Sequence, residues 1–101
     1  MKNSQEKVEQ FVEENNLGGT TAFRILDLAS EIGEIASDAT KTTDYGSNEN
    51  DLKVKEDEIG DAFFSLLALA SDLGIDAEEA LEKSIQKYKE RIENSGEPGS
   101  S

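Results

Sequence analysis

Apolar residues recur at intervals of three and four along most of this chain, which is the spacing of one face of an α-helix. The strict alternation of apolar and polar positions that marks a half-buried strand is not found. The pattern therefore predicts helices throughout and an all-α fold. The expected helices run from Asn3 to the glycines at 18–19, from Thr20 or Thr21 to about Lys41, from about Asp51 to Leu73, just before Gly74, and from Asp76 to about Asn94.

Several residues at the expected helix ends are suited to capping. Asn3 with Glu6, and Asp76 with Glu79, have the spacing of a capping box, in which two side chains satisfy each other's backbone N–H groups. Residues 41–50 are polar and rich in turn-forming types, so they are expected to form the one substantial loop.

The apolar faces of the last three helices are expected to form the core. Their members are Ile25, Leu28, Ile32, Ile35 and Ala39, then Ile59, Phe63, Leu66, Ala70 and Leu73, then Ala80, Leu81, Ile85, Tyr88 and Ile92. Short links predict antiparallel neighbours, with the second and third helices forming a hairpin. Only 35% of the residues are apolar, so the core of one chain would be thin. We expect a four-helix, bundle-like fold of antiparallel hairpins that is completed by dimerisation, with residues 1–95 as one domain and 96–101 as a disordered tail.

Composition narrows the chemistry that these helices can support. The chain has 101 residues, no cysteine and no histidine, so a metal would have to be held by oxygen. A net charge of −13 favours cations and disfavours nucleic acids and anionic membranes as partners. No apolar run approaches the roughly 20 residues of a membrane span, and the first residues lack the apolar segment of a signal peptide. The expected location is cytoplasmic.

Two short acidic words lie within the second and third expected helices. Glu31 and Glu34 are three residues apart, as are Glu58 and Asp61, and residues so spaced are neighbours on one face of a helix. In an antiparallel hairpin the two words would lie roughly level, so that four carboxylates converge. Such carboxylates repel one another unless a hard cation neutralises them, which favours a magnesium site. The alternative is that these acids are the solvated face of amphipathic helices.

A glycine lies inside each acidic word, at Gly33 and Gly60. Glycine within a helix costs about 1 kcal/mol relative to alanine. The repetition of this cost beside both acid pairs predicts that a partner helix or a ligand approaches the backbone closely there.

At these residues the chain resembles the all-α nucleotide pyrophosphohydrolases of the MazG-like type, which are marked by EXXE, a spacer and then EXXD. Here the marks are Glu31 with Glu34 and Glu58 with Asp61. The resemblance extends over about residues 22–92. Its context comprises residues 26–35, 56–67 and 73–76 and the final helix with Lys87 and Arg91.

The resemblance implies a magnesium-dependent hydrolysis of nucleoside triphosphates (NTP or dNTP) to a monophosphate and pyrophosphate. The catalytic and metal-binding residues would be Glu31, Glu34, Glu58 and Asp61, holding one or two Mg²⁺ ions, for which Mn²⁺ is a possible substitute. Glu34 or Glu31 would orient the attacking water or accept its proton. Members of the family assemble as homodimers or homotetramers, in agreement with the thin core expected here.

An anionic substrate also needs positive charge. The candidate substrate-binding residues are Lys41, Lys53, Lys55, Lys87, Tyr88 and Arg91. The resemblance supports a role for Lys87 and Arg91, whereas the other lysines equally suit a solvated surface or helix-end electrostatics. Tyr88 is a candidate for the core or for contact with the nucleotide. The chain lacks the tryptophan that many relatives carry near the end of the first helix, so the preferred base is not predicted.

Other functions fit parts of the pattern. Within the family, the activity could be the removal of non-canonical nucleotides, or a narrower one on dUTP, dCTP or phosphoribosyl-ATP. Outside it, the chain could be a non-catalytic acidic helical module that binds a partner protein or divalent cations. A cation-binding module needs the acids alone, whereas an enzyme acting on an anion also needs the basic residues.

Overall fold

The computed structural model describes residues 2–95, which form an all-α fold without strands in that range. The elements are α1 (Lys2–Glu14), α2 (Thr21–Thr42), the short 3₁₀ helix η1 (Glu49–Asp51), α3 (Glu56–Asp72) and α4 (Ala77–Ser95). The predicted fold class is thus confirmed. The predicted tail at 96–101 lies outside the described residues. None of the described helices is long and apolar enough to cross a membrane.

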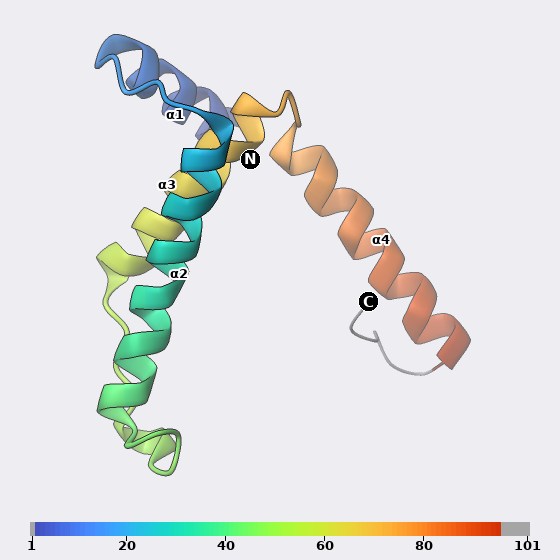
Figure 1. Ribbon diagram of the computed structural model, residues 1–101. Coiled ribbons are helices and arrows are strands. Elements are labelled where there is room, and N and C mark those ends of the chain that lie inside the picture. The colour runs from blue at the N-terminus through green and yellow to red at the C-terminus, as the bar shows by residue number, and fades with distance from the viewer. Residues whose placement is uncertain (1, 96–101) are drawn as a thin grey trace.

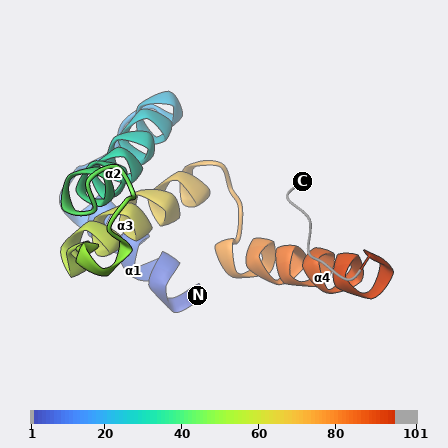
Figure 2. The same cartoon turned by 90° about the horizontal axis from the view of Figure 1, so that it is seen from below.

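Helices α2 and α3 lie side by side and antiparallel, as Figures 1 and 2 both show. At one end of this hairpin Arg24 Nε donates to Asp72 Oδ2 at 3.0 Å, and at the other end Lys53 N–H donates to Thr42 Oγ1, also at 3.0 Å. The predicted hairpin is therefore present. Helix α1 packs on α3, whereas α4 extends away from the hairpin and makes only a small contact with α1 (Figure 1).

Local capping explains where several helices begin and end. Thr20 Oγ1 accepts the Phe23 N–H at 3.1 Å at the start of α2, so Thr20 is the cap of the two candidates. Asp76 Oδ1 accepts the N–H groups of Glu78 and Glu79 at 3.0 and 3.2 Å at the start of α4. Gly74, with φ of +69°, follows α3 in the left-handed conformation that glycine adopts without strain.

Helix α1 differs from the prediction at both ends. It begins at Lys2, so Asn3 lies inside the helix rather than at its cap. It ends at Glu14 because Asn16, with φ of +54°, takes the left-handed position, and Leu17 N–H then bonds Val12 O at 3.0 Å. Asparagine is the non-glycine residue that most readily fills this position, so the helix stops before the glycines at 18–19.

Helix α3 begins at Glu56, five residues after the predicted start at Asp51. Lys55 is extended (φ −78°, ψ 147°), and the bond from Lys53 to Thr42 ties the preceding segment to α2. The first turn of α3 then carries three acidic residues, Glu56, Asp57 and Glu58. Negative charge at a helix N-terminus is favoured by the helix dipole, so this start is electrostatically sound.

The buried core of the chain is small. Its central cluster is Val8, Leu67 and Ala68, against which Val12, Phe64 and Ala77 pack. Ala62 and the predicted core residue Ala70 are buried as well. The predicted core face of α4 is wrong for a single chain, because no residue of that helix is buried and Leu81, Ile85, Tyr88 and Ile92 are 42–49% exposed. Several predicted core residues of the hairpin are also about half exposed, namely Ile25, Ile32, Ile59, Leu66 and Leu73. The thin core is confirmed, and dimerisation stays a prediction.

Candidate active site

Acidic residues of α2 and α3 face one another across the hairpin. Glu31 on α2 interacts electrostatically with Asp61 on α3, and with Glu34 and Asp27 on its own helix. Burial, followed by these three negative charges and a hydrogen bond with Glu34, raises the pKa of Glu31 above its ordinary value. The first acidic word is therefore level with the end of the second, close to the predicted register.

Glu58 has a different partner from the one that the sequence suggested. It forms a hydrogen bond with Asp38, one turn beyond the first acidic word. That bond, then burial, then the negative charge of Asp38 raise the pKa of Glu58, and Lys55 partly offsets the rise. The negative charge of Asp38 disfavours a second negative charge beside it, so the protonated form of Glu58 is favoured relative to a free glutamate.

One carboxylate oxygen from each acidic word is buried without a hydrogen-bond partner. These atoms are Glu31 Oε2 and Glu58 Oε2. A buried unpaired carboxylate oxygen is unfavourable, and oxygen ligands of this kind are those that Mg²⁺ prefers. The donor atoms therefore fit a hard cation. Within residues 2–95, however, no three carboxylates are already gathered into a metal-binding group.

Two further acids of α2 lie on the same side of the helix as Glu31 and Glu34, and neither was among the predicted site residues. Asp27 accepts a hydrogen bond from the buried Ser65 hydroxyl at 2.9 Å, which links α2 to α3. Asp38 is the partner of Glu58. The sequence spacing already places both in one acidic stripe with Glu31 and Glu34 along α2, but the spacing alone does not show which members of the stripe meet α3.

A partly buried ion pair at the end of the hairpin helps to fix the register of these acids. Arg24 is 8% exposed, and its guanidinium donates to Asp72 Oδ2 and to Leu17 O, each at 3.0 Å. The first bond joins α2 to α3, and the second holds the connection from α1. Since α2 and α3 are rigid helices, a fixed contact at Arg24 also fixes which acids face each other further along.

The predicted basic residues are divided between two regions. Lys55 lies beside Glu58 at the start of α3, and its charge acts on that carboxylate. Lys41 and Lys53 are exposed near the same end of the hairpin. Lys87, Tyr88 and Arg91 lie on α4, which both views show leading away from the hairpin (Figures 1 and 2).

The α4 residues form a local group of their own. Lys87 Nζ lies 5.0 Å, and Arg91 Cζ 6.0 Å, from the centre of the Tyr88 ring. Tyr88 is 42% exposed, so of the two candidate roles the core is excluded within this chain. One chain alone does not bring this group to the acids.

The predicted close approach at the two glycines is not found within the chain. A methyl group added at Gly33 or Gly60 would meet no atom within 4 Å beyond its own helix. No helix of the described part of the chain packs there, so a close approach by a helix of a second copy or by a ligand stays a prediction.

Comparison of the sequence with known protein families identifies the family of this chain. Residues 21–95 match the model of the MazG nucleotide pyrophosphohydrolase domain. The chain belongs to the MazG family. The matched region of this MazG domain includes α2, α3 and α4, and so both acidic words, while α1 precedes it.

This MazG domain is also similar to a curated protein of unassigned function. The chain is 31% identical over 96 residues to the "Uncharacterized protein YpjD" of Bacillus subtilis (strain 168), a match that covers 90% of this chain and 85% of the relative. No solved structure gives a significant match. Family membership points to nucleotide pyrophosphohydrolase chemistry in general.

Proposed function

We propose that this MazG domain hydrolyses nucleoside triphosphates, NTP or dNTP, to the monophosphate and pyrophosphate with the aid of Mg²⁺. The observation that carries the proposal is the pair of buried, unpartnered oxygens Glu31 Oε2 and Glu58 Oε2, one on each of the paired helices α2 and α3 and both within the family's matched region. Unpaired buried acceptors on both helices are expected where a cation is to be held. Removal of non-canonical nucleotides is the role we expect for such an activity.

Four carboxylates would hold one or two Mg²⁺ ions, with Mn²⁺ as a substitute: Glu31, Glu34, Glu58 and Asp61. The bound ion screens the triphosphate and lowers the pKa of a coordinated water. Glu34 is exposed and adjoins Glu31, so its carboxylate is placed at the solvent side of the site, where it would orient the attacking water. Asp27, already bonded to Ser65, would instead keep α2 and α3 in register.

Positive charge would hold the phosphates from two sides. Lys55, at the start of α3, adjoins the acids of its own chain, with Lys41 and Lys53 nearby. Because α4 leads away from the hairpin, Lys87 and Arg91 would meet the acids of a second copy instead. This arrangement requires the homodimer or homotetramer that the sequence predicts, and it would cover the exposed apolar face of α4. The cytoplasmic location stays a prediction.

The second candidate is a non-catalytic module that binds divalent cations or a partner protein. The exposed apolar face of α4, with Leu81, Ile85 and Ile92 each 44–49% exposed, is the observation that favours it. This candidate uses the acids or the apolar face and has no need of a nucleotide.

A pyrophosphate-release assay separates the two. The protein is incubated with NTPs and dNTPs, with and without Mg²⁺, beside Glu58→Gln and the matched control Asp57→Asn, whose exposed side chain is on the adjacent position of α3. We expect Glu58→Gln to lose roughly a hundredfold or more in activity and Asp57→Asn to keep it. No release from any nucleotide would reject the enzyme, and full activity in Glu58→Gln would reject the site.

A further inference from the structure

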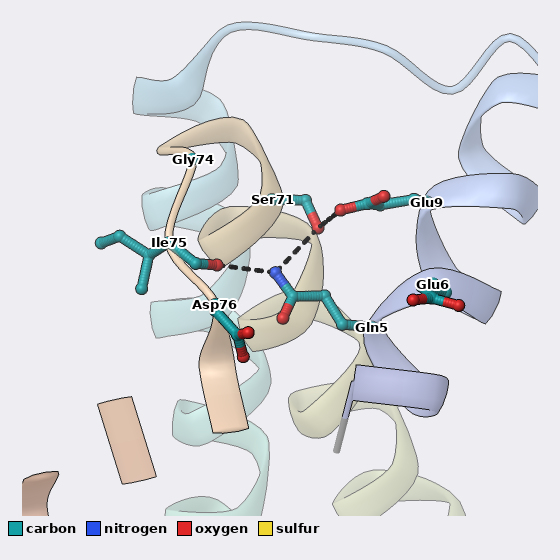
Figure 3. A pocket seen from close by; sticks show the side chains of 7 residues that line it. All are labelled: Gln5, Glu6, Glu9, Ser71, Gly74, Ile75 and Asp76. Carbon is teal, nitrogen blue, oxygen red and sulfur yellow. Dashed lines mark hydrogen bonds between the residues drawn. The ribbon is translucent and has the colours of Figure 1, made fainter. Parts of the chain in front are cut away.

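The side chain of Gln5 is buried at the point where α3 leads into α4 (Figure 3). Its Nε2 donates to Ile75 O at 2.7 Å and to Ser71 Oγ at 3.2 Å, and its Oε1 accepts the Ala77 N–H at 2.8 Å. One amide group on α1 thereby contacts the last turn of α3, the connection, and the first residue of α4. These bonds span 66 to 72 residues of sequence, so they are tertiary and not local.

The rest of the connection leaves few other restraints on α4. Gly74 (φ +69°) and the bond from Ile75 N–H to Ala70 O at 2.9 Å end α3, and Ala77 packs against the small core. Beyond that point α4 leads away into solvent, with a small contact to α1 (Figure 2). A rigid helix attached at one end takes its direction from the geometry of that end. Gln5 is the buried polar side chain that bonds both sides of it.

We propose that Gln5 is a positioning residue that sets the direction of α4, and with it the placement of Lys87 and Arg91. The consequence for substrate binding rests on the proposed function, whereas the effect on the direction of α4 does not. Gln5 would act through α4, since its hydrogen bonds go to residues 71, 75 and 77 and not to the metal-binding candidates Glu31, Glu34, Glu58 and Asp61.

The chemistry of the contact requires an amide. The Ile75 carbonyl needs a donor and the Ala77 N–H needs an acceptor, and both must come from one planar group. Ser71 Oγ donates its own proton to Glu9 Oε1 at 2.7 Å, which leaves an oxygen lone pair facing Gln5 (Figure 3). A carboxylate at position 5 would place negative charge against two oxygens, and methionine would supply neither bond.

Spin-label distances test the direction of α4 directly. The chain has no cysteine, so Ser30→Cys on α2 and Lys89→Cys on α4, both exposed, give unique labelling sites. Labelled protein is diluted with excess unlabelled protein, so that distances within one chain are measured by double electron–electron resonance. The test variant is Gln5→Met. The matched control is Gln10→Met, which removes an exposed bond to Glu14 on the same helix.

We expect a narrow distance distribution in the parent and in Gln10→Met, and a broad or displaced one in Gln5→Met at temperatures well below its melting point. If Gln5→Met lowers the melting temperature and leaves the distribution unchanged, the residue is merely structural and the proposal is wrong. The same labels in Gln5→Glu serve if Gln5→Met does not fold. Protonated glutamic acid again offers a donor and an acceptor, so its distribution should narrow at acidic pH.

Acidification also titrates the other acids of this pocket, which are Glu6, Glu9 and Asp76. The labelled parent at each pH is therefore the reference. A distribution in Gln5→Glu that follows the parent at every pH would contradict the proposal.

Enzyme kinetics test the consequence for substrate. We expect Gln5→Met to raise KM for the triphosphate roughly tenfold and to change kcat little, because the displaced Lys87 and Arg91 bind phosphate and take no part in bond cleavage. An unchanged KM beside a broadened distribution would overturn the link to substrate. If the parent releases no pyrophosphate at all, the proposed function fails, and the spin-label result still decides the role of Gln5.

Discussion

Replacing the glycines of the acidic words by alanine should stabilise the isolated chain. At Gly33 and Gly60 an added methyl group meets nothing within 4 Å beyond the helix itself, so no steric cost offsets the gain in helix propensity. That gain is about 1 kcal/mol per site. For a domain of this size it corresponds to a rise of roughly 4–8 °C in melting temperature per substitution. Circular dichroism melts in EDTA at low protein concentration measure it.

The matched control is Gly74→Ala. A methyl group there also meets nothing within 4 Å, but the φ of +69° disfavours any residue with a side chain. We expect Gly74→Ala to lose about 1 kcal/mol or more, which separates backbone conformation from available space. A lower melting temperature for Gly33→Ala or Gly60→Ala would refute the reasoning that these positions are open. A higher melting temperature together with a loss of pyrophosphate release would identify a ligand as the neighbour that the glycines accommodate.

Further predictions concern the charges. In EDTA, the raised pKa of Glu31 and of Glu58 means that both bind protons more tightly in the folded chain than in the unfolded one, so stability should fall as pH rises above the ordinary glutamate pKa of 4.5. Mg²⁺ should reverse that loss near neutrality, and melting temperature against pH with and without Mg²⁺ measures both effects. Glu58→Gln should melt no lower than the parent in EDTA and should respond less to Mg²⁺; a large drop would indicate a structural role. Arg24→Met should lower the free energy of unfolding in urea by about 2–3 kcal/mol, which is less than for a fully buried pair because the Asp72 side chain is 28% exposed. Adding Asp72→Asn should restore part of that free energy, whereas additive losses would argue against the pair.

Features that depend on local sequence were predictable. Helical periodicity located the four helices of residues 2–95, and Thr20 and Asp76 cap their helices because a side-chain oxygen needs only the next turn as its partner. Helix ends that depend on distant contacts were missed. The start of α3 is displaced because the segment before it bonds Thr42, a contact that no local pattern reveals.

The sequence pattern predicts that the acids of two antiparallel helices lie near one another, but it predicts only in part which acids are neighbours. Antiparallel pairing places Glu31 beside Asp61, as expected, whereas Glu58 meets Asp38 instead of the first word. The register depends on the tertiary bond of Arg24 to Asp72, and the sequence pattern carries no information on it. The apolar stripe of α4 likewise predicted that this face of the helix packs against another surface. It did not show whether that surface belongs to the same chain or to another molecule.

The small number of contacts between α4 and the hairpin has a consequence for the proteolytic stability of a newly synthesised chain. A helix with few tertiary contacts unfolds locally at little free-energy cost, and an unfolded segment is open to proteases. Basic residues follow one another along α4 at Lys83, Lys87, Lys89 and Arg91, so trypsin should cut there first. If a second copy protects this helix, the half-life of the protein would increase with its concentration. Halving its synthesis would then reduce its steady-state concentration by more than half.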